Sequence, residues 1–315
     1  MGEGVGGERC ADVPDVTLVL HLRRSRRKAR DAGAAEVAAL FGDRNGRALR
    51  AGPLSEVSGV AWVGLDDTPA SVIEERLRFL GYSDTVELVR GLDEVDEPDE
   101  SRRRARWKGR DVVLVPVYAE SDGAMRTGAP DVRSFLLECG DGVVRRIDGY
   151  RGGPGPLERR ALPVADARLL VNLVAQPERG CLVEPFAGAG GVVIQARAAG
   201  WRTYSLDADP TLRYGLAELA DGHVVGDAAA LPFATGSVDA VATEPPYHTS
   251  ALDVVVASVP EVARVLRPGG KAAFLVGADQ ADAMLHAGKQ AGLTTALAAA
   301  IDRKGTAVFC VAWRR

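Results

Sequence analysis

The chain is poor in the residues that usually bind metals or form disulfide frameworks. Its 315 residues include four cysteines and four histidines. The cysteines, at positions 10, 139, 181 and 310, lack the paired spacing of a zinc site or a disulfide-rich domain. We therefore expect no metal ion, and we interpret Cys181 as a core residue of a strand.

Long apolar runs are also missing. No stretch of 18 apolar residues occurs, and the first nine residues are rich in glycine and charge, so the sequence supports neither a membrane span nor a signal peptide. With 46% hydrophobic and 26% charged residues, the composition is that of a soluble protein with two domains. We expect a cytoplasmic protein without a membrane partner.

The carboxyl-terminal half contains a strand, a glycine-rich turn and a helix in succession. A short apolar run at 180–183 ends at Glu184, three glycines follow at positions 188, 190 and 191, and residues 192–199 have a helical pattern. Glycines let the backbone approach a ligand closely, and a helix start offers unpaired N–H groups. Taken alone, the turn is equally typical of a tight connection in any α/β protein.

Acidic residues recur where the following strands end. Further strands are expected at 202–206, 223–225 and 238–243. The acids at or just after the four strand ends are Glu184, Asp207, Asp227 and Glu244. Each acid alone would be a turn or cap residue, but the carboxyl ends of parallel strands face one crevice. The recurrence therefore predicts a ligand site, in which Asp207 is placed to accept ribose hydroxyls.

The last of these acids begins the run Glu244-Pro245-Pro246-Tyr247. A carboxylate and a rigid proline carbonyl can each accept an N–H of a planar amine, while a tyrosine stacks on its ring. Such prolines also make surface turns, but the apolar strand before them favours a central position. His248 follows, either as a substrate contact or as a solvated turn residue.

These motifs resemble those of class I S-adenosylmethionine-dependent amino-methyltransferases, which usually read Asp-Pro-Phe-x-Gly-x-Gly and Asp/Asn-Pro-Pro-Tyr. The run Val265-Leu266-Arg267-Pro268-Gly269-Gly270 resembles the turn before the fifth strand of that fold. Within the class, the chain is most similar to the tRNA guanine-N2 methyltransferases, on the grounds of residues 167–173, the run Leu231-Pro232-Phe233 and a separate amino-terminal half. The resemblance covers about residues 160–315.

The resemblance implies a Rossmann-like α/β domain with a seven-stranded, mostly parallel sheet and S-adenosylmethionine as cofactor. It implies a cofactor site made of Glu184, Phe186, Gly188, Gly190, Asp207, Asp227 and Ala228. It implies a catalytic site for the amine made of Glu244, Pro245, Pro246 and Tyr247. Both motifs begin with glutamate where the family has aspartate, so each carboxylate is displaced outward by one methylene.

The amino-terminal half has the pattern of an α+β unit. Strands are expected at 16–22, 57–63 and 85–89, and helices at 31–41 and 69–80. This alternating order suggests a ferredoxin-like sandwich. Residues 91–100 then carry six acids and no base, and residues 101–110 carry six bases, which is typical of a charge-segregated linker.

Three regions follow from this. We expect an α+β ferredoxin-like domain at 1–95, a charged linker with a small β subdomain at 96–160, and the methyltransferase domain at 161–315. The small sheet would contain strands at 112–118, 134–138 and 143–147.

Two basic runs, at 23–30 and 102–110, are candidates for RNA contact. The second contains Arg102, Arg103, Arg104 and Trp107, which suit phosphate contact and base stacking. Residues 1–160 hold 26 bases and 28 acids, so any positive surface would need to come from spatial segregation. Solvated faces are the other interpretation of these runs.

Three functions remain open. The first is N-methylation of a base amine in RNA, with guanine N2 in tRNA foremost and with the base flipped into the Glu244 motif. The second is N-methylation of a small or nucleoside-like amine, with the amino-terminal half as a lid. The third is a non-catalytic binding protein that keeps the cofactor fold. DNA methylation is weaker still, because no sequence-reading module is recognisable.

Overall fold

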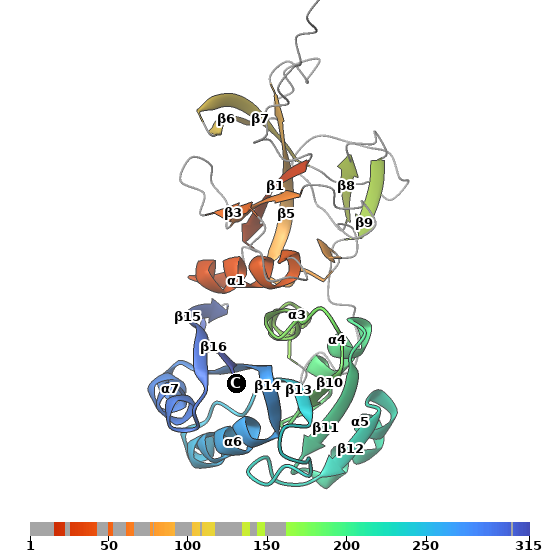
Figure 1. Cartoon of the computed structure of the whole chain (residues 1–315), viewed down its shortest axis with the longest axis vertical. Coiled ribbons are helices and arrows are strands. Elements are labelled where there is room, and N and C mark those ends of the chain that lie inside the picture. Colours follow the sequence, from red (N-terminus) through yellow and green to blue (C-terminus); the bar gives the residue numbers. More distant parts are fainter. Residues whose placement is uncertain are drawn as a thin grey trace, which may run out of the picture.

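A computed structural model of the chain shows two stacked parts (Figure 1). It describes residues 16–22, 26–42, 50–52, 61–65, 76–77, 79–91, 103–107, 109–116, 134–138, 144–148, 162–303 and 305–315. Most of the helix expected at 69–80 and the basic run from Arg23 to Ser25 lie outside these residues. None of the described helices is long and apolar enough to cross a bilayer.

The carboxyl-terminal part is built on an eight-stranded sheet with the order β12-β11-β10-β13-β14-β16-β15-β2. The strands are β10 (Cys181–Glu184), β11 (Arg202–Asp207), β12 (Gly222–Val225), β13 (Val238–Thr243), β14 (Leu266–Gly277), β15 (Thr294–Arg303), β16 (Thr306–Arg314) and β2 (Arg26–Arg27). The pairs from β12 to β14 are parallel, and β16 is antiparallel to β14 and β15. The predicted seven-stranded, mostly parallel sheet is therefore confirmed, and β2 adds an eighth strand that the sequence did not indicate.

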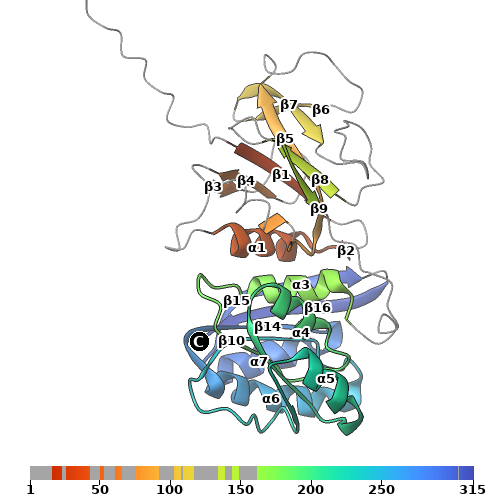
Figure 2. The same ribbon diagram turned by 90° about the vertical axis from the view of Figure 1, so that its right-hand side faces the viewer.

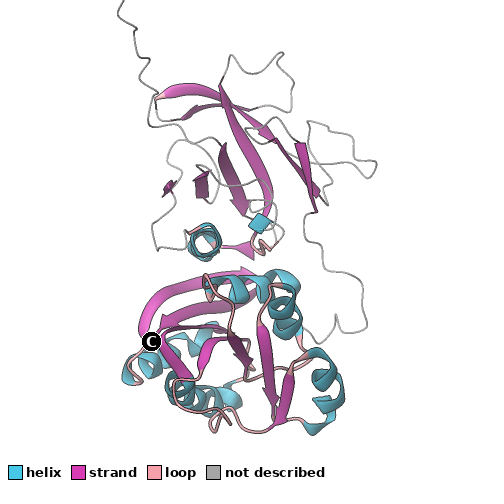
Figure 3. Ribbon diagram, turned by 45° about the vertical axis from the view of Figure 1, so that its right-hand side comes forward, coloured by secondary structure: helices cyan, strands magenta, loops and turns pink. Residues whose placement is uncertain are grey.

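Helices cover both faces of this sheet (Figure 3). They are α3 (Val164–Leu173), α4 (Gly191–Ala198), α5 (Arg213–Leu219), α6 (Leu252–Val265) and α7 (Ala281–Gln290). Successive side chains of β13 alternate between two buried clusters: Ala240 packs in the cluster of α3 and α4, and Val241 in that of α6 and α7. A strand buried on both faces has to be apolar throughout, which is why these strands were recognisable from sequence.

The amino-terminal part is built on a six-stranded sheet with the order β3-β4-β1-β5-β7-β6. Its strands are β1 (Val16–Leu22), β3 (Arg50–Gly52), β4 (Ala61–Leu65), β5 (Ser83–Gly91), β6 (Arg103–Trp107) and β7 (Arg110–Pro116). Helix α1 (Arg30–Phe41) lies between this sheet and the carboxyl-terminal part, and β8 (Ser134–Glu138) pairs with β9 (Val144–Asp148) in a separate ribbon (Figure 2).

The details of this half differ from the sequence-based expectation. Strands β1 and β3, which lie before and after α1 in this sheet, are both antiparallel to β4 and lie on either side of it, which is the arrangement of a split β-α-β unit. Strand β5 pairs with the other side of β1, and β7 and β6 extend the sheet beyond the four strands of a ferredoxin-like sandwich. The expected boundary at residue 95 falls between β5 and β6, which belong to one sheet. Strand β7, expected to join β8 and β9, pairs with β5 and β6 instead.

The two parts share a buried interface between α1 and α3. Ala29 and Ala32 belong to the same apolar cluster as Leu169. Glu36 of α1 is fully buried there, and its carboxylate accepts hydrogen bonds from the Asn172 amide at 2.7 Å and from two backbone N–H groups at 2.7 and 2.9 Å. Burial raises the pKa of Glu36, and these three donors lower it. The interface therefore contains a buried polar group, but its carboxylate is hydrogen-bonded.

Candidate active site

All four predicted strand-end acids lie at one edge of the sheet. Strands β10, β11, β12 and β13 are parallel, so Glu184, Asp207, Asp227 and Glu244 lie at or just beyond their shared carboxyl edge. Burial raises the pKa of Glu184, and the negative charges of Glu244 and Asp207 raise it further. Asp227 lies exposed at the end of β12, where its Oδ1 accepts the N–H of Ala229 at 2.9 Å, beside the buried Ala228.

The glycine turn connects the first two of these strands. The N–H of Gly188 donates to Asp207 Oδ2 at 2.7 Å, so this carboxylate holds the turn as well as ending β11. Gly188 has φ +49°, and an added Cβ would meet no atom within 4 Å, so the backbone there borders open space. Gly190 has φ +84° and precedes α4; a Cβ there would lie 2.8 Å from Leu219 Cδ1. Both positions therefore favour glycine, for conformation at the first and also for space at the second.

Glu184 is the most buried of the strand-end acids. Its side chain is 1% exposed, and its Oε1 accepts hydrogen bonds from Thr243 Oγ1 and from the N–H of Phe186. These donors are neutral, and the neighbouring carboxylates carry the same charge as Glu184. A cation bound at this edge would stabilise the ionised form of Glu184, so the acids suit a positively charged ligand.

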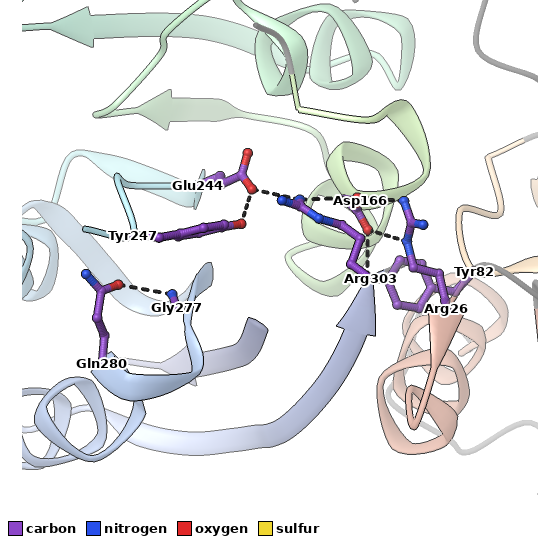
Figure 4. Close-up of polar contacts among 8 residues, drawn as sticks. All are labelled: Arg26, Tyr82, Asp166, Glu244, Tyr247, Gly277, Gln280 and Arg303. Atoms are coloured by element: carbon purple, nitrogen blue, oxygen red, sulfur yellow. Dashed lines mark hydrogen bonds and ion pairs between the residues drawn. The ribbon is translucent and has the colours of Figure 1, made fainter. Parts of the chain in front are cut away.

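The Glu244 motif has the geometry of a hydrogen-bond acceptor beside an aromatic ring (Figure 4). Glu244 Oε1 accepts hydrogen bonds from the hydroxyl of Tyr247 and from Arg303 Nη1, the latter at 2.8 Å. Both of these hydrogen bonds from described residues are thus accepted by the same carboxylate oxygen, Oε1. Burial raises the pKa of Glu244, whereas Tyr247 and Arg303 lower it and Asp166 raises it. One oxygen is thus fixed, and Oε2 is left to accept a further donor.

Gln280 holds the loop that follows Glu244. Its Oε1 accepts the N–H of Gly277 at 3.0 Å, and its Nε2 donates to the carbonyl of Pro246 at 3.1 Å. Because Gln280 is 1% exposed, this bridge from β14 is well protected from water. Pro245 is buried and Pro246 exposed, so the two prolines point to different environments.

Arg303 and Asp166 were not among the site residues predicted from sequence. Arg303 ends β15 and lies 59 positions from Glu244. Asp166, in the first turn of α3, is fully buried and lies 3.4 Å from Arg303 Nη1. Local patterns cannot reveal such distant pairs; an acid in a first helical turn is normally interpreted as a favourable end charge.

The remaining predicted residues lie away from these contacts or are described only in part. His248 is exposed and hydrogen-bonds Ser250 Oγ at 2.8 Å, so its role in substrate binding stays a prediction. Arg104 is exposed on β6. Arg102 lies outside the described residues, and only the backbone is described at Arg103 and Trp107.

Comparison with known proteins points to one activity class. Residues 186–274 match the family described as a methyltransferase domain. The chain is 33% identical over 120 residues to the tRNA (guanine(10)-N2)-dimethyltransferase of Pyrococcus abyssi (strain GE5 / Orsay), a match that covers 34% of this chain and 35% of that protein. The chain thus spans about a third of the length of this relative.

Solved structures show weaker similarity. Geranyl diphosphate C-methyltransferase from Streptomyces coelicolor A3(2) is 15% identical, with a TM-score of 0.41 over 49% of this chain and 76% of that chain. The putative methyltransferase in complex with the Haloferax volcanii Trm112 activator is 18% identical, with a TM-score of 0.36 over 44% of this chain and 83% of that chain.

The sheet order places an antiparallel strand next to β14 at one end of an otherwise parallel ladder, and the family match spans the glycine turn and β13. Both findings agree with the Rossmann-like α/β domain expected from the sequence. The carboxyl-terminal part of the chain therefore has a Rossmann-like α/β fold, and the family match within it supports a class I S-adenosylmethionine-dependent methyltransferase.

Proposed function

We propose that this protein transfers a methyl group to an exocyclic amine of a base in RNA, with the N2 amine of guanine in tRNA as the first candidate. The observation that carries the proposal is the Glu244 carboxylate, with Oε1 fixed by two donors and Oε2 open, beside the ring of Tyr247. A planar amine that donates to Oε2 would have its ring within reach of Tyr247.

The residues on the methyl-donor side of the site, which we call the donor half, fit S-adenosylmethionine. Bound there, this cofactor supplies an electrophilic methyl group on a positively charged sulfur. Glu184 and the backbone of Gly188 would hold its amino-acid end, Asp207 its ribose hydroxyls, and Asp227 with the N–H of Ala228 its adenine. The buried carboxylate of Glu184 supports this assignment, because a cationic ligand compensates a buried negative charge.

The acceptor half has to make a weak nucleophile reactive. The lone pair of an aromatic amine is delocalised into its ring, and two acceptors that bind its N–H groups localise that pair on nitrogen. Glu244 Oε2 is one acceptor, and the backbone carbonyl of the buried Pro245 is the other. Well-oriented reactants reach effective molarities of about 10⁵ M or more, so orientation accounts for much of the acceleration.

The proton of the amine also needs a destination. Methylation would leave the nitrogen of the amine cationic, and Glu244 Oε2 would accept one of its N–H protons. Burial raises the pKa of Glu244, which favours its acceptance of this proton, while Tyr247 and Arg303 favour the ionised form beforehand. Water then removes the proton after the product leaves.

Tyr247 provides a stacking surface for the base. The Arg303 guanidinium carbon lies 5.6 Å from the centre of the Tyr247 ring, on one face. A base would therefore stack on the opposite face, an interaction that contributes about 1 to 3 kcal/mol in single-strand binders.

The amino-terminal half supports a large substrate. Arg104, Arg106 and Arg110 are exposed on the β6–β7 hairpin. Figure 2 shows this hairpin at the end of the molecule remote from the catalytic sheet. A structured RNA is long enough to contact both regions, whereas a free nucleoside is not.

A small amine substrate is the second candidate, and one observation favours it. Arg26, within the first basic run, is 4% exposed and bound to Asp166, so it is withdrawn from phosphate contact. The net charge of −4 gives no general attraction for RNA.

The decisive experiment is methyl transfer in vitro to tRNA transcripts and to a nucleoside mixture, followed by mass spectrometry of the nucleosides. We expect N2-methylguanosine in tRNA from the wild type and none from Glu244→Gln. Methylated nucleosides without modified tRNA would favour the second candidate, and cofactor binding without any transfer would indicate a non-catalytic protein.

A further inference from the structure

We propose that Arg303 is a positioning residue for Glu244, and that the amino-terminal half of the chain holds Arg303 in place through Asp166 and Arg26. This inference rests on the proposed function, because it assigns Glu244 to the acceptor half of the site. It adds that the acceptor site is completed by Arg26, which lies 140 positions before Asp166 in the sequence.

The first step is the contact between Arg303 and the Glu244 motif. Arg303 Nη1 donates to Glu244 Oε1 at 2.8 Å, the same oxygen that accepts the Tyr247 hydroxyl (Figure 4). The guanidinium carbon also lies 5.6 Å from the centre of the Tyr247 ring. Two donors on one oxygen fix the rotation of the carboxylate and direct Oε2 away from them. Arg303 therefore determines which oxygen is presented to an amine.

The second step is what holds Arg303. Asp166 Oδ2 lies 3.4 Å from Arg303 Nη1 and accepts Arg26 Nη2 at 2.7 Å, while its Oδ1 accepts Arg26 Nε and the Tyr82 hydroxyl, each at 2.7 Å. The side chain of Asp166 is 0% exposed and that of Arg26 is 5% exposed. A two-point contact between buried charges has little freedom to rearrange, so Asp166 gives Arg303 a fixed neighbour.

The pairing of two strands places Arg26 and Arg303 beside the Asp166 carboxylate. Strand β2 pairs with β15 so that Arg26 is opposite Arg303 and Arg27 is opposite Asp302. This two-residue strand is the only described segment of the amino-terminal half that joins the catalytic sheet. Its attachment point is therefore the residue that contacts Glu244.

The charges of the row Arg26, Asp166, Arg303 and Glu244 are balanced, with two cations and two anions. If Arg26 were removed, Asp166 would draw Arg303 away from Glu244, because a buried carboxylate needs a partner. If Arg303 were removed, Glu244 would lose one of its two fixing donors while the negative charge of Asp166 stayed nearby. Both changes should weaken the contact that fixes the Glu244 carboxylate and should disfavour its ionised form.

The test compares Arg303→Met, Arg303→Lys and Arg26→Met with the wild type. Arg267→Met is the matched control, because Arg267 also pairs with a carboxylate, Asp239, but near the amino end of β13, whereas Glu244 follows the carboxyl end of that strand. We expect kcat to fall about 100-fold in Arg303→Met, as small misplacements of reacting groups do, with KM changed far less. Arg303→Lys should recover part of the loss, and Arg26→Met should show the same effect more weakly.

The pH dependence separates positioning from general damage. Glu244 faces Tyr247 of its own loop, Arg303 of β15, Asp166 of α3 and the carboxylate of Glu184 on β10. Loss of Arg303 removes the cation from this set, so the acid limb of the kcat profile should move to higher pH. Cofactor affinity, measured by calorimetry, should stay within about twofold, because no cofactor contact changes.

Failure of the inference can be told apart from failure of the proposed function. The pKa of Glu244 can be followed by ¹³C NMR of carboxyl-labelled glutamate, assigned with Glu244→Gln, whether or not any substrate is methylated. A higher pKa in Arg303→Met supports the inference even if RNA is not the substrate. An unchanged pKa and an unchanged kcat in a folded Arg303→Met, or equal effects in Arg267→Met, would overturn it. If Arg26→Met does not fold, Arg26→Lys keeps the charge without the two-point contact and replaces it.

Discussion

The interface between the two halves can be tested through Asp166→Asn, a substitution that removes a charge and changes little else in shape. Asp166 is fully buried and accepts two hydrogen bonds from Arg26 and one from Tyr82, with Arg303 at 3.4 Å. The asparagine would turn an amide donor toward these donors and leave two guanidinium groups without their shared anion.

The expected cost follows from burial. Removing one partner of a buried ion pair destabilises a protein by about 3 to 5 kcal/mol, because the remaining charge is uncompensated. At about 2 to 4 °C per kcal/mol for a large domain, Tm should fall by about 10 °C. The measurement is chemical denaturation followed by fluorescence, with scanning calorimetry for Tm.

A half-exposed pair serves as the control. Glu261 accepts hydrogen bonds from Arg264 on the same helix, with side chains 21% and 34% exposed, so Glu261→Ala should cost about 1 kcal/mol. If Asp166→Asn destabilises the protein no more than this control, the buried row of charges does not hold the halves together, and the reasoning from burial is wrong.

Three further predictions concern the two halves of the site. Glu244→Gln should lower the single-turnover rate about 100-fold or more, because a neutral amide accepts the amine proton poorly, while calorimetry finds cofactor affinity within twofold. Asp207→Ala should do the reverse and weaken cofactor binding about 10- to 100-fold, the effect of losing hydrogen bonds to a charged group; an unchanged Kd would place the ribose elsewhere. Burial raises the pKa of Glu184 in the free protein, and a bound cationic cofactor would lower it. At a pH between the pKa of Glu184 in the complex and its pKa in the free protein, cofactor binding should therefore release protons. The affinity for the cofactor should rise with pH until Glu184 is ionised in the free protein. Calorimetry in two buffers of different ionisation enthalpy counts these protons, and no release at any pH would contradict the role of Glu184.

Much of the catalytic half could be predicted from sequence because its physics is local. A strand such as β13 is buried on both faces and is therefore apolar throughout, and its predicted bounds are those of the structure. The turn around Gly188 needs residues without a side chain, and this leaves a visible pattern. These features depend on residues that are close together in the sequence, so they can be predicted from a single sequence.

The amino-terminal half was predicted less well, because charge segregation masked a strand. Residues 101–110 carry six bases and were interpreted as a linker, yet they include β6. In that strand Arg104 and Arg106 are exposed and Ala105 between them is half-buried, the alternation of a strand with one solvated face. Glu36 shows the same difficulty in a helix, because its buried acceptors are satisfied by residues 45 and 136 positions away.

The glutamates at the start of both motifs now have a physical explanation. The longer side chain of Glu184 reaches Thr243 at the end of the neighbouring strand, and that of Glu244 reaches the hydroxyl of Tyr247 and the guanidinium of Arg303. Each extra methylene is therefore accompanied by hydrogen bonds that fix the carboxylate. Because Arg303 is in turn paired with Asp166, the glutamate at 244 joins the proposed acceptor site to the amino-terminal half. The two glutamates and the contact between the two halves are then two aspects of one arrangement.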